Sequence, residues 1–432
     1  MTFSHKAILP MRYLILAAEI VFLSFRAEAQ TTQSLSIQEC YTLANQNYPL
    51  TKQHDLIKSS EDYSVTNISF GYLPKITVSG QATYQSDVTK IPISFPGLHI
   101  PELSKDQYKL AGEISEPLTD LITVHQQGKL QEVNSSIQEE NLDTELFKLK
   151  DRINQLFFGA LLLDEQIDQN NLLKKDIQTG IASITAGISN GVNFKTDLDK
   201  LNAELLKANQ RGVELQSSRN AYAAMLSLFI NKSIDSTTVL EKPEAPSISK
   251  EIHRPELVTF DSQRKSYDIQ DNLVLIKNLP KFELFFQEGV GKPSPVNLFS
   301  TDWSSYYYAG IRLNWSLSNL YTFSNEWQIN EINRKMVDAQ KETFLFNTNL
   351  ALRQQQEEIT KLQKLLSSDD AIVDLQVAIK TTSKAQLENG VITANDFLKA
   401  INAEDEARQN RVLHEVQLLI AEYNYQNTSG NQ

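Results

Sequence analysis

The sequence predicts a fold of mixed α and β class that is mainly α, with long coiled-coil helices and four β-strands. Three observations predict it. Long stretches without proline carry apolar residues at heptad spacing, short stretches alternate apolar and polar residues, and this pattern occurs twice along the chain. The net charge of −12 disfavours nucleic acid as a partner, because phosphate contacts require Lys and Arg.

The first 29 residues resemble a secretory signal peptide. Lys6 and Arg12 precede a short apolar stretch at 13–25, and residues 27–29 form a small-x-small cleavage site. Either Met1 or Met11 is the start of this segment. The alternative, a membrane anchor, requires a longer apolar stretch. No apolar run of about 18 residues follows, so we expect an exported chain that enters a membrane only through β-strands.

The two halves of the remaining chain resemble each other. Three short motifs recur in the same order: Leu-Pro-Lys at 73–75 and 279–281, Tyr-x-x-Ala-Gly at 108–112 and 306–310, and Asn-Gly-Val at 190–192 and 389–391. We therefore expect a signal peptide at 1–29, a first structural repeat at 30–242, a linker at 243–254 and a second repeat at 255–432. Prolines 243 and 246 mark the linker. Each repeat is expected to contain a helix, two strands and a long helical hairpin.

The predicted strands have one apolar and one polar face. From Ile76, every second residue to Tyr84 is apolar or glycine, and the residues between them are polar. Alternation of this kind also predicts strands that begin near Tyr108, Phe282 and Tyr307, although Phe285 falls on the polar face. The last strand is expected to include Trp315 and Leu317. The pattern suits strands between lipid and water, and it equally suits a soluble sheet with one solvated face.

The predicted helices are unusually long. Apolar residues step by four and three at Leu142, Leu146, Leu149, Ile153, Leu156, Ala160, Leu163 and Ile167. Apolar residues recur every seven positions at Leu345, Leu352, Ile359 and Leu366. Sustained spacing of this kind packs helices side by side as coiled coils. A helix from about 121 to 189 would be roughly 100 Å long at 1.5 Å per residue.

Four strands per chain cannot close a barrel, and open strand edges are not tolerated in lipid. If the strands cross a membrane, several chains must therefore pool them. Two chains would pool eight strands, and a barrel of eight strands is filled by its own side chains. A conducting pore favours three or more copies.

Each repeat contains one turn between two long helices. Gly191 and Gly390 are expected to take the positive φ that ends a helix. Thr393 then stands at the N-cap of the returning helix, and Asp396 three residues later completes a capping box. Phe194 stands at the equivalent position of the first repeat, so the cap there is less obvious.

Asp197 and Asp396 fall in the first turns of the returning helices. One interpretation is that they complement the helix N-termini, which is worth about 0.3–1 kcal/mol. The other is that they line the closed end of a duct, where like charges in a ring attract cations.

These features, taken together, resemble the TolC family of outer-membrane efflux proteins. The resemblance covers essentially the whole chain after residue 29. It rests on the N-terminal segment at 35–49, the paired Leu-Pro-Lys entries to the strands, Glu-Pro-Leu at 116–118 and both Gly-Val turns. No single motif is decisive, but their order and duplication are.

The resemblance implies a homotrimer in the outer membrane of a Gram-negative bacterium. The four strands of each chain would contribute to a shared trimeric β-barrel. The antiparallel coiled-coil helices would form an α-barrel across the periplasm and meet a periplasmic adaptor (membrane fusion) protein of an inner-membrane pump. The implied function is the channel of a tripartite efflux or type I secretion system.

The resemblance also assigns candidate site residues. Asp396 matches an aspartate of the family's constriction, and Asp197 is its counterpart in the first repeat. Lys399 stands where the best-known member has a second aspartate, and its spacing allows a pair with Asp396. The adaptor-docking tips would be Asn190, Gly191, Val192, Asn389, Gly390, Val391 and Thr393.

Three other classes of protein compete with this interpretation. An enzyme finds little support. Residues 187–191 fit Gly-x-Ser-x-Gly, but a heptad helix precedes the serine where that chemistry needs a strand. The six histidines are scattered, Cys40 is the only cysteine, and no cofactor or metal is expected. A secreted coiled-coil scaffold or adhesin that conducts nothing stays open. So does an adaptor, although adaptors usually carry a single hairpin.

Overall fold

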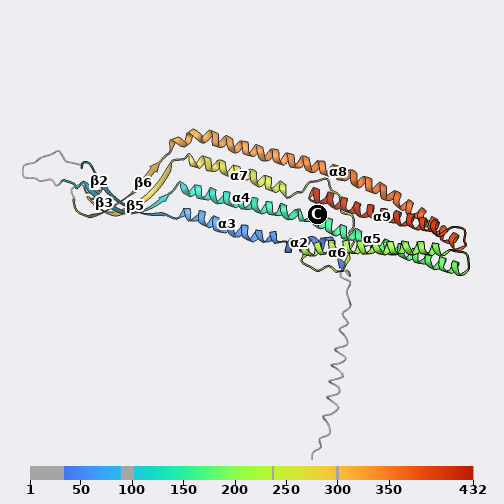
Figure 1. Ribbon diagram of the computed structural model, residues 1–432. Helices are drawn as coiled ribbons and strands as arrows, with labels where there is room; N and C mark the ends of the chain where they lie inside the picture. The colour runs from blue at the N-terminus through green and yellow to red at the C-terminus, as the bar shows by residue number, and fades with distance from the viewer. Residues whose placement is uncertain (1–33, 89–101, 236–237, 298–300, 432) are drawn as a thin grey trace, which may run out of the picture. The chain divides into compact units, whose positions relative to one another are not determined.

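The computed structural model describes residues 34–88, 102–235, 238–297 and 301–431. The expected signal peptide lies outside the described residues. So do most of 90–103 and part of 290–302, the stretches between paired strands that their prolines predict to be surface loops. The helices are α2 (Ile37–Asn47), α3 (Gln53–Ser69), α4 (Asp120–Phe147), α5 (Leu149–Ser189), α6 (Lys195–Ile230), α7 (Glu256–Lys277), α8 (Leu320–Glu388) and α9 (Ala394–Ser429) (Figure 1). The strands are β1 (Ser34–Leu35), β2 (Lys75–Tyr84), β3 (Asp106–Pro117), β4 (Val239–Leu240), β5 (Lys281–Lys292) and β6 (Ser304–Asn314).

The fold is mainly helical with a minority of strands, as the periodicity predicts. Helix, two strands and a helical hairpin follow each other twice in the described chain. The first repeat begins with two helices, α2 and α3, separated by the short 3₁₀ helix η1 (Pro49–Lys52), where Pro49 opens the new turn. No helix in the described part of the chain is both long and apolar enough to cross a membrane.

The chain divides into two compact units, and each takes segments from both expected repeats. The hairpin unit contains the described residues up to 47 together with 152–245 and 361–420. The strand unit contains 48–151, 246–360 and 421–432. These units do not coincide with the two repeats. A compact unit is defined by how segments pack, whereas a repeat is defined by similarity between segments of the sequence. Duplication therefore stays a prediction.

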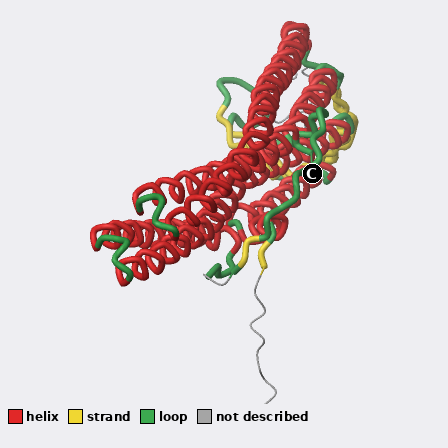
Figure 2. The backbone as a smooth tube through the Cα atoms, turned by 90° about the vertical axis from the view of Figure 1, so that its right-hand side faces the viewer, coloured by secondary structure: helices red, strands yellow, loops and turns green. Residues whose placement is uncertain are grey.

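In the strand unit, β2, β3, β5 and β6 form one antiparallel sheet in that order. Figure 1 labels these four strands, and Figure 2 draws strands in yellow. The sheet leads into α3, α4 and α7, in which α4 packs against both α3 and α7. Thr119, just before α4, ties the two repeats together. Its hydroxyl donates to the Pro280 carbonyl at 3.1 Å and accepts from the Phe282 amide at 3.1 Å.

The last strand is shorter than the alternation predicts. It ends at Asn314, and Trp315 and Leu317 belong to the entry of α8 through the 3₁₀ helix η3 (Leu317–Asn319). The indole N–H of Trp315 donates to the Asn278 carbonyl at the end of α7, 3.1 Å away. This tertiary contact turns the chain out of the sheet, so placing Trp315 and Leu317 on the strand was wrong.

The helix expected over 121–189 is interrupted once. α4 ends at Phe147 and α5 begins at Leu149. The Lys148 amide still donates to the Thr144 carbonyl at 3.3 Å, so helical bonding continues across the interruption.

The linker holds the C-terminal end of α9. The His253 amide donates to the Ser429 carbonyl at 2.7 Å, and the Asn431 side chain donates to the Glu251 carbonyl at 2.9 Å. Gly430 has a φ of 79°, and a Cβ at this position would lie 2.5 Å from the backbone carbonyl atoms of His253. Glycine is therefore required both by the left-handed conformation and by the close approach of the linker.

We expect Gly430→Ala to destabilise the folded protein by about 1–2 kcal/mol from the left-handed conformation alone. The clash with His253 adds to this cost. Gly128→Ala is the matched control, because Gly128 lies inside α4 with nothing within 4 Å of its Cβ position. That substitution should stabilise the helix by up to about 1 kcal/mol. Denaturant unfolding followed by circular dichroism measures both, and equal midpoints would contradict the prediction.

Candidate membrane face and hairpin tips

The sheet presents one exposed apolar face. The register aligns Ile76 with Ile114 and Ile114 with Phe286, so the apolar positions of neighbouring strands share this face. Its most exposed side chains are Ile76, Val78, Tyr84, Leu110, Tyr307, Ile311 and Leu313, all more than half exposed. Continuous exposed apolar surface of this kind marks a protein or membrane contact. Glu288 and Glu116 are carboxylates on this face.

The opposite face carries the polar groups. Arg312 on β6 lies 3.2 Å from Glu113 on β3 and also pairs with Glu283 on β5. Its guanidinium stacks over the ring of Phe285, 4.4 Å from the ring centroid. Phe285 is the aromatic residue that the alternation places on the polar face. Ala111 and Tyr306 on this face are almost fully buried. The two faces therefore differ both in polarity and in burial.

The sheet has two open edges within the chain. β2 and β6 are the end strands in the order β2-β3-β5-β6, and each pairs with one neighbour among the described residues. A strand edge leaves a row of backbone groups without partners, which another chain can pair. The exposed face and the open edges belong to the same sheet.

The two hairpin turns have the same backbone geometry. Gly191 between α5 and α6 has a φ of 74°, and Gly390 between α8 and α9 has a φ of 68°. The next residue in each turn, Val192 or Val391, donates its amide to a carbonyl five residues earlier at 2.8 Å. This bond and the positive φ define a Schellman motif. The prediction of positive φ at both glycines is confirmed.

The caps of the returning helices differ, as predicted. At the start of α9, the Asp396 amide donates to the Thr393 hydroxyl at 3.3 Å, and that hydroxyl donates to the Asp396 carboxylate at 2.7 Å. The hydrogen bond from Thr393 holds the pKa of Asp396 below its ordinary value, with a further contribution from Lys399. Phe194 at the start of α6 makes no side-chain cap.

Each returning helix carries one acid–base pair. Lys399 lies 3.4 Å from Asp396, as the spacing predicts, and Lys200 lies 3.4 Å from Asp197. Lys200 was not among the predicted site residues, although its three-residue spacing from Asp197 matches that of Lys399 from Asp396.

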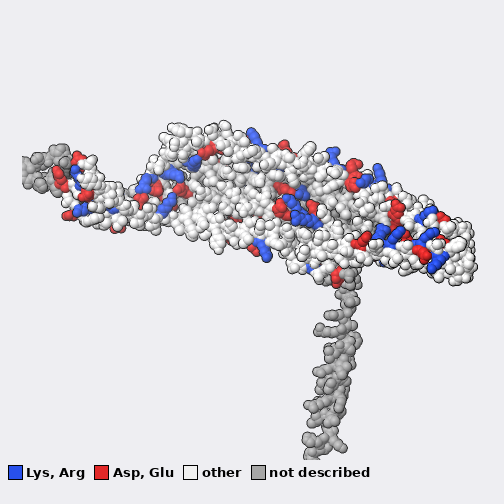
Figure 3. Space-filling view, viewed as in Figure 1, with Lys and Arg blue, Asp and Glu red and all other residues white. Residues whose placement is uncertain are grey.

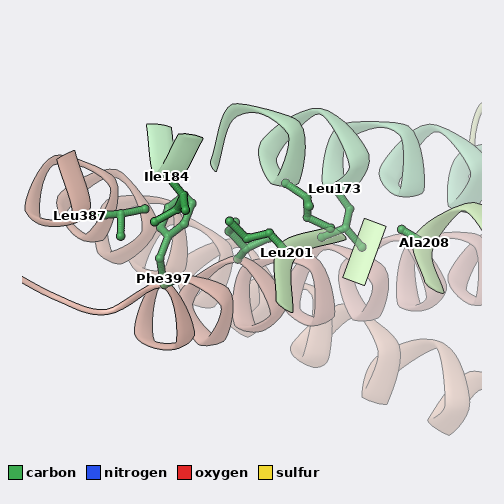
Figure 4. Close-up of a cluster of buried hydrophobic side chains, with 9 residues drawn as sticks. Leu173, Ile184, Leu201, Ala208, Leu387 and Phe397 are labelled. Atoms are coloured by element: carbon green, nitrogen blue, oxygen red, sulfur yellow. The ribbon is translucent and has the colours of Figure 1, made fainter. Parts of the chain in front are cut away.

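The two turns meet in the hairpin unit. A methyl carbon of Val192 lies 3.2 Å from the position that a Cβ would take at Gly390. Below the turns, α5, α6, α8 and α9 share one apolar core (Figure 4). Its buried members are Leu173, Ile177, Ile184, Leu201, Ala208, Leu387, Ala394, Phe397 and Ile401. Val192, Phe194 and Val391 remain 60–75% exposed at the tips.

A charged network joins the same helices beside this core. Lys380 on α8 lies 2.8 Å from Asp176 on α5 and 2.6 Å from the buried Glu404 on α9. Burial lowers the pKa of Lys380, but its bonds to these two carboxylates outweigh burial and raise it above the ordinary lysine value. Arg211 on α6 pairs with Asp405 on α9 at 3.1 Å. Nothing in the linear pattern distinguishes these residues from surface charges.

The described residues contain no group of three or more His, Cys, Asp or Glu placed to hold a metal ion. Cys40 is buried in the hairpin unit, and burial raises the pKa of its thiol to about 12. A thiol in this state is a poor nucleophile.

Comparison with protein-family models finds no match, and comparison with curated protein sequences finds none. Solved structures do match over most of the chain. The channel CusC superposes with a TM-score of 0.69 at 12% identity, covering 92% of this chain and 92% of that chain. The outer-membrane protein VceC of Vibrio cholerae gives 0.65 at 11% identity, covering 91% and 96%.

The outer-membrane channel MtrE of Neisseria gonorrhoeae, in its open state, gives a TM-score of 0.63 at 12% identity, covering 91% of this chain and 89% of that chain. Likeness at this level of identity establishes architecture. The chain therefore has the TolC-like fold of outer-membrane channel proteins, as the resemblance in its sequence predicts.

Proposed function

We propose that this protein is the outer-membrane channel of a tripartite efflux or type I secretion system in a Gram-negative bacterium. It would pass substrates from an inner-membrane pump and a periplasmic adaptor across the periplasm and the outer membrane. The observation that carries the proposal is the exposed apolar face of the four-stranded sheet, in a chain whose fold matches outer-membrane channels over more than nine-tenths of its length. Strands with one apolar and one polar face suit the boundary between lipid and a water-filled lumen.

The open edges of the sheet support assembly. In lipid, the backbone groups of β2 and β6 need partners, and a neighbouring copy can supply them. Three copies would pool twelve strands, enough to leave a lumen, whereas two copies would pool eight and fill it with side chains. We therefore propose a homotrimer that shares one β-barrel, with the helices of the three copies forming an α-barrel in the periplasm.

Native mass spectrometry of the protein extracted from outer membranes in detergent tests this proposal. A trimer is the expected result. A monomer that stays in solution without detergent would contradict it, and would favour a secreted coiled-coil scaffold that conducts nothing.

We further propose that the hairpin tips dock the adaptor and that Asp396 and Asp197 line the narrow end of the duct. Exposed Val192 and Val391 support docking, because apolar side chains at a tip offer contact area to a partner. The position of both aspartates in the first turns next to the meeting point of the hairpins supports the constriction.

Val192→Asp combined with Val391→Asp is expected to abolish efflux while leaving the amount of assembled protein in the outer membrane unchanged. Both side chains are exposed, so the substitutions cost little in folding. Export of a fluorescent pump substrate from cells measures efflux, and crosslinking to the adaptor measures docking. Normal efflux with normal crosslinking would refute the role of the tips.

A further inference from the structure

The hairpin ends are electrically balanced in a chain that is otherwise strongly acidic. The chain carries a net charge of −12. In residues 184–200, Lys195 and Lys200 offset Asp197 and Asp199. In residues 384–400, Lys384 and Lys399 offset Glu388 and Asp396. Lysine and acidic side chains accordingly lie mixed over the ends of these hairpins (Figure 3).

Both hairpins place a lysine beside the tip aspartate at the same position. Lys200 and Lys399 each stand three residues after the tip aspartate, and each ammonium lies 3.4 Å from a carboxylate oxygen. The lysine side chains are 52% and 72% exposed, so their charge reaches the surrounding water. Each tip acid therefore has a lysine ammonium group beside it.

We propose that Lys200 and Lys399 set the charge selectivity of the duct, so that its narrow end admits anionic and cationic substrates alike. The inference rests on the proposed function, in which the tips form that narrow end. A ring of unpaired carboxylates concentrates cations and binds divalent ions. Lysines at contact distance cancel most of this field, because the two opposite charges form a short dipole whose potential decays faster than that of a single charge.

The competing explanation is that these pairs only support their helices. Pairs spaced by three residues contribute about 0.2–0.5 kcal/mol to an isolated helix. Such a role predicts small changes in stability and none in ion selectivity. Lys207 provides the matched control, since it pairs with Glu204 at 3.2 Å on the same helix α6, further from the turn.

The test is the reversal potential of the purified full-length protein in planar lipid bilayers under a KCl gradient. The wild type is expected to show a cation-to-anion permeability ratio near one and no block by Mg²⁺. Lys200→Gln combined with Lys399→Gln should raise this ratio at least about threefold and introduce Mg²⁺ block. Lys207→Gln should leave both unchanged. Adding Asp197→Asn and Asp396→Asn to the double variant should return the ratio to that of the wild type.

Two outcomes overturn the inference by itself. One is a conducting wild type that already selects strongly for cations, and the other is a double variant with the selectivity of the wild type. A wild type that forms no conducting pore at all overturns the proposed function, and the inference with it.

Discussion

Val78→Lys is expected to remove most of the assembled protein from the outer membrane. Val78 is 75% exposed on the apolar face of the sheet, in the middle of β2. A lysine on the lipid side of a membrane strand costs about 2–4 kcal/mol at the bilayer midplane, falling toward the interfaces. In the proposed homotrimer the substitution occurs once in every copy, so the cost to assembly is multiplied.

Thr77→Lys is the matched control, because Thr77 is the adjacent residue and its side chain projects from the opposite face. There it stands across from Glu113, an arrangement that favours a lysine. We expect this variant to assemble normally. Immunoblots of the outer-membrane fraction, run with and without heating to separate trimer from monomer, measure both. Equal depletion of the two variants, or normal assembly of Val78→Lys, would show that the apolar face does not contact lipid.

The contrast between these neighbouring residues could be predicted from the sequence, because a period of two fixes which side chains share a face. Both helix-to-helix turns could also be predicted from the sequence. Only glycine takes a positive φ without cost, and Gly191 and Gly390 follow long stretches that favour helix. The capping box at Thr393 was predictable for a similar reason, since all of its hydrogen bonds lie within four residues.

Features that depend on distant segments could not be predicted. The end of β6 is set by the bond of Trp315 to Asn278, and alternation continues past that point by chance. The parallel pair of β1 and β4 spans two residues in each strand, too few to show any period. The pairs of Lys380 with Asp176 and of Arg211 with Asp405 join helices from both repeats, and in the linear sequence these residues look like ordinary surface charges.

Arg219 is the clearest case of a residue whose importance appears only in the fold. It lies on α6 in the hairpin unit, and its side chain is 3% exposed. Its guanidinium donates to the Asp164 carboxylate at 3.0 Å, the Asp235 carbonyl at 2.8 Å and the Thr238 carbonyl at 2.9 Å. One side chain thus attaches the chain that follows α6 to α5.

Arg219→Met is expected to destabilise the protein by at least about 1.5–3 kcal/mol, the usual range for the loss of a hydrogen bond to a charged group, because the buried guanidinium bonds two backbone carbonyls as well as the partly exposed Asp164. Methionine keeps the unbranched apolar part of the side chain, so the loss is mainly of hydrogen bonds and charge. Arg411→Met is the control. Arg411 pairs with Asp370 at 2.6 Å, but its side chain is 37% exposed, so its removal should cost at most about 1 kcal/mol. Denaturant unfolding of the detergent-solubilised proteins measures both, and similar midpoints would refute the prediction.

The deficit of Arg219→Met should also depend on pH. Burial raises the pKa of Asp164, and the guanidinium of Arg219 opposes that rise, so its removal should raise this pKa further. An acid whose folded-state pKa is raised favours folding below its unfolded pKa, and this advantage is lost as the pH rises through the folded pKa. The variant should therefore be closer to the wild type at acidic pH than at neutral pH, because protonation of Asp164 removes the charge that has lost its partner. A deficit that is the same at both pH values would mean that the lost bonds to the Asp235 and Thr238 carbonyls, and not the stranded carboxylate, account for the destabilisation.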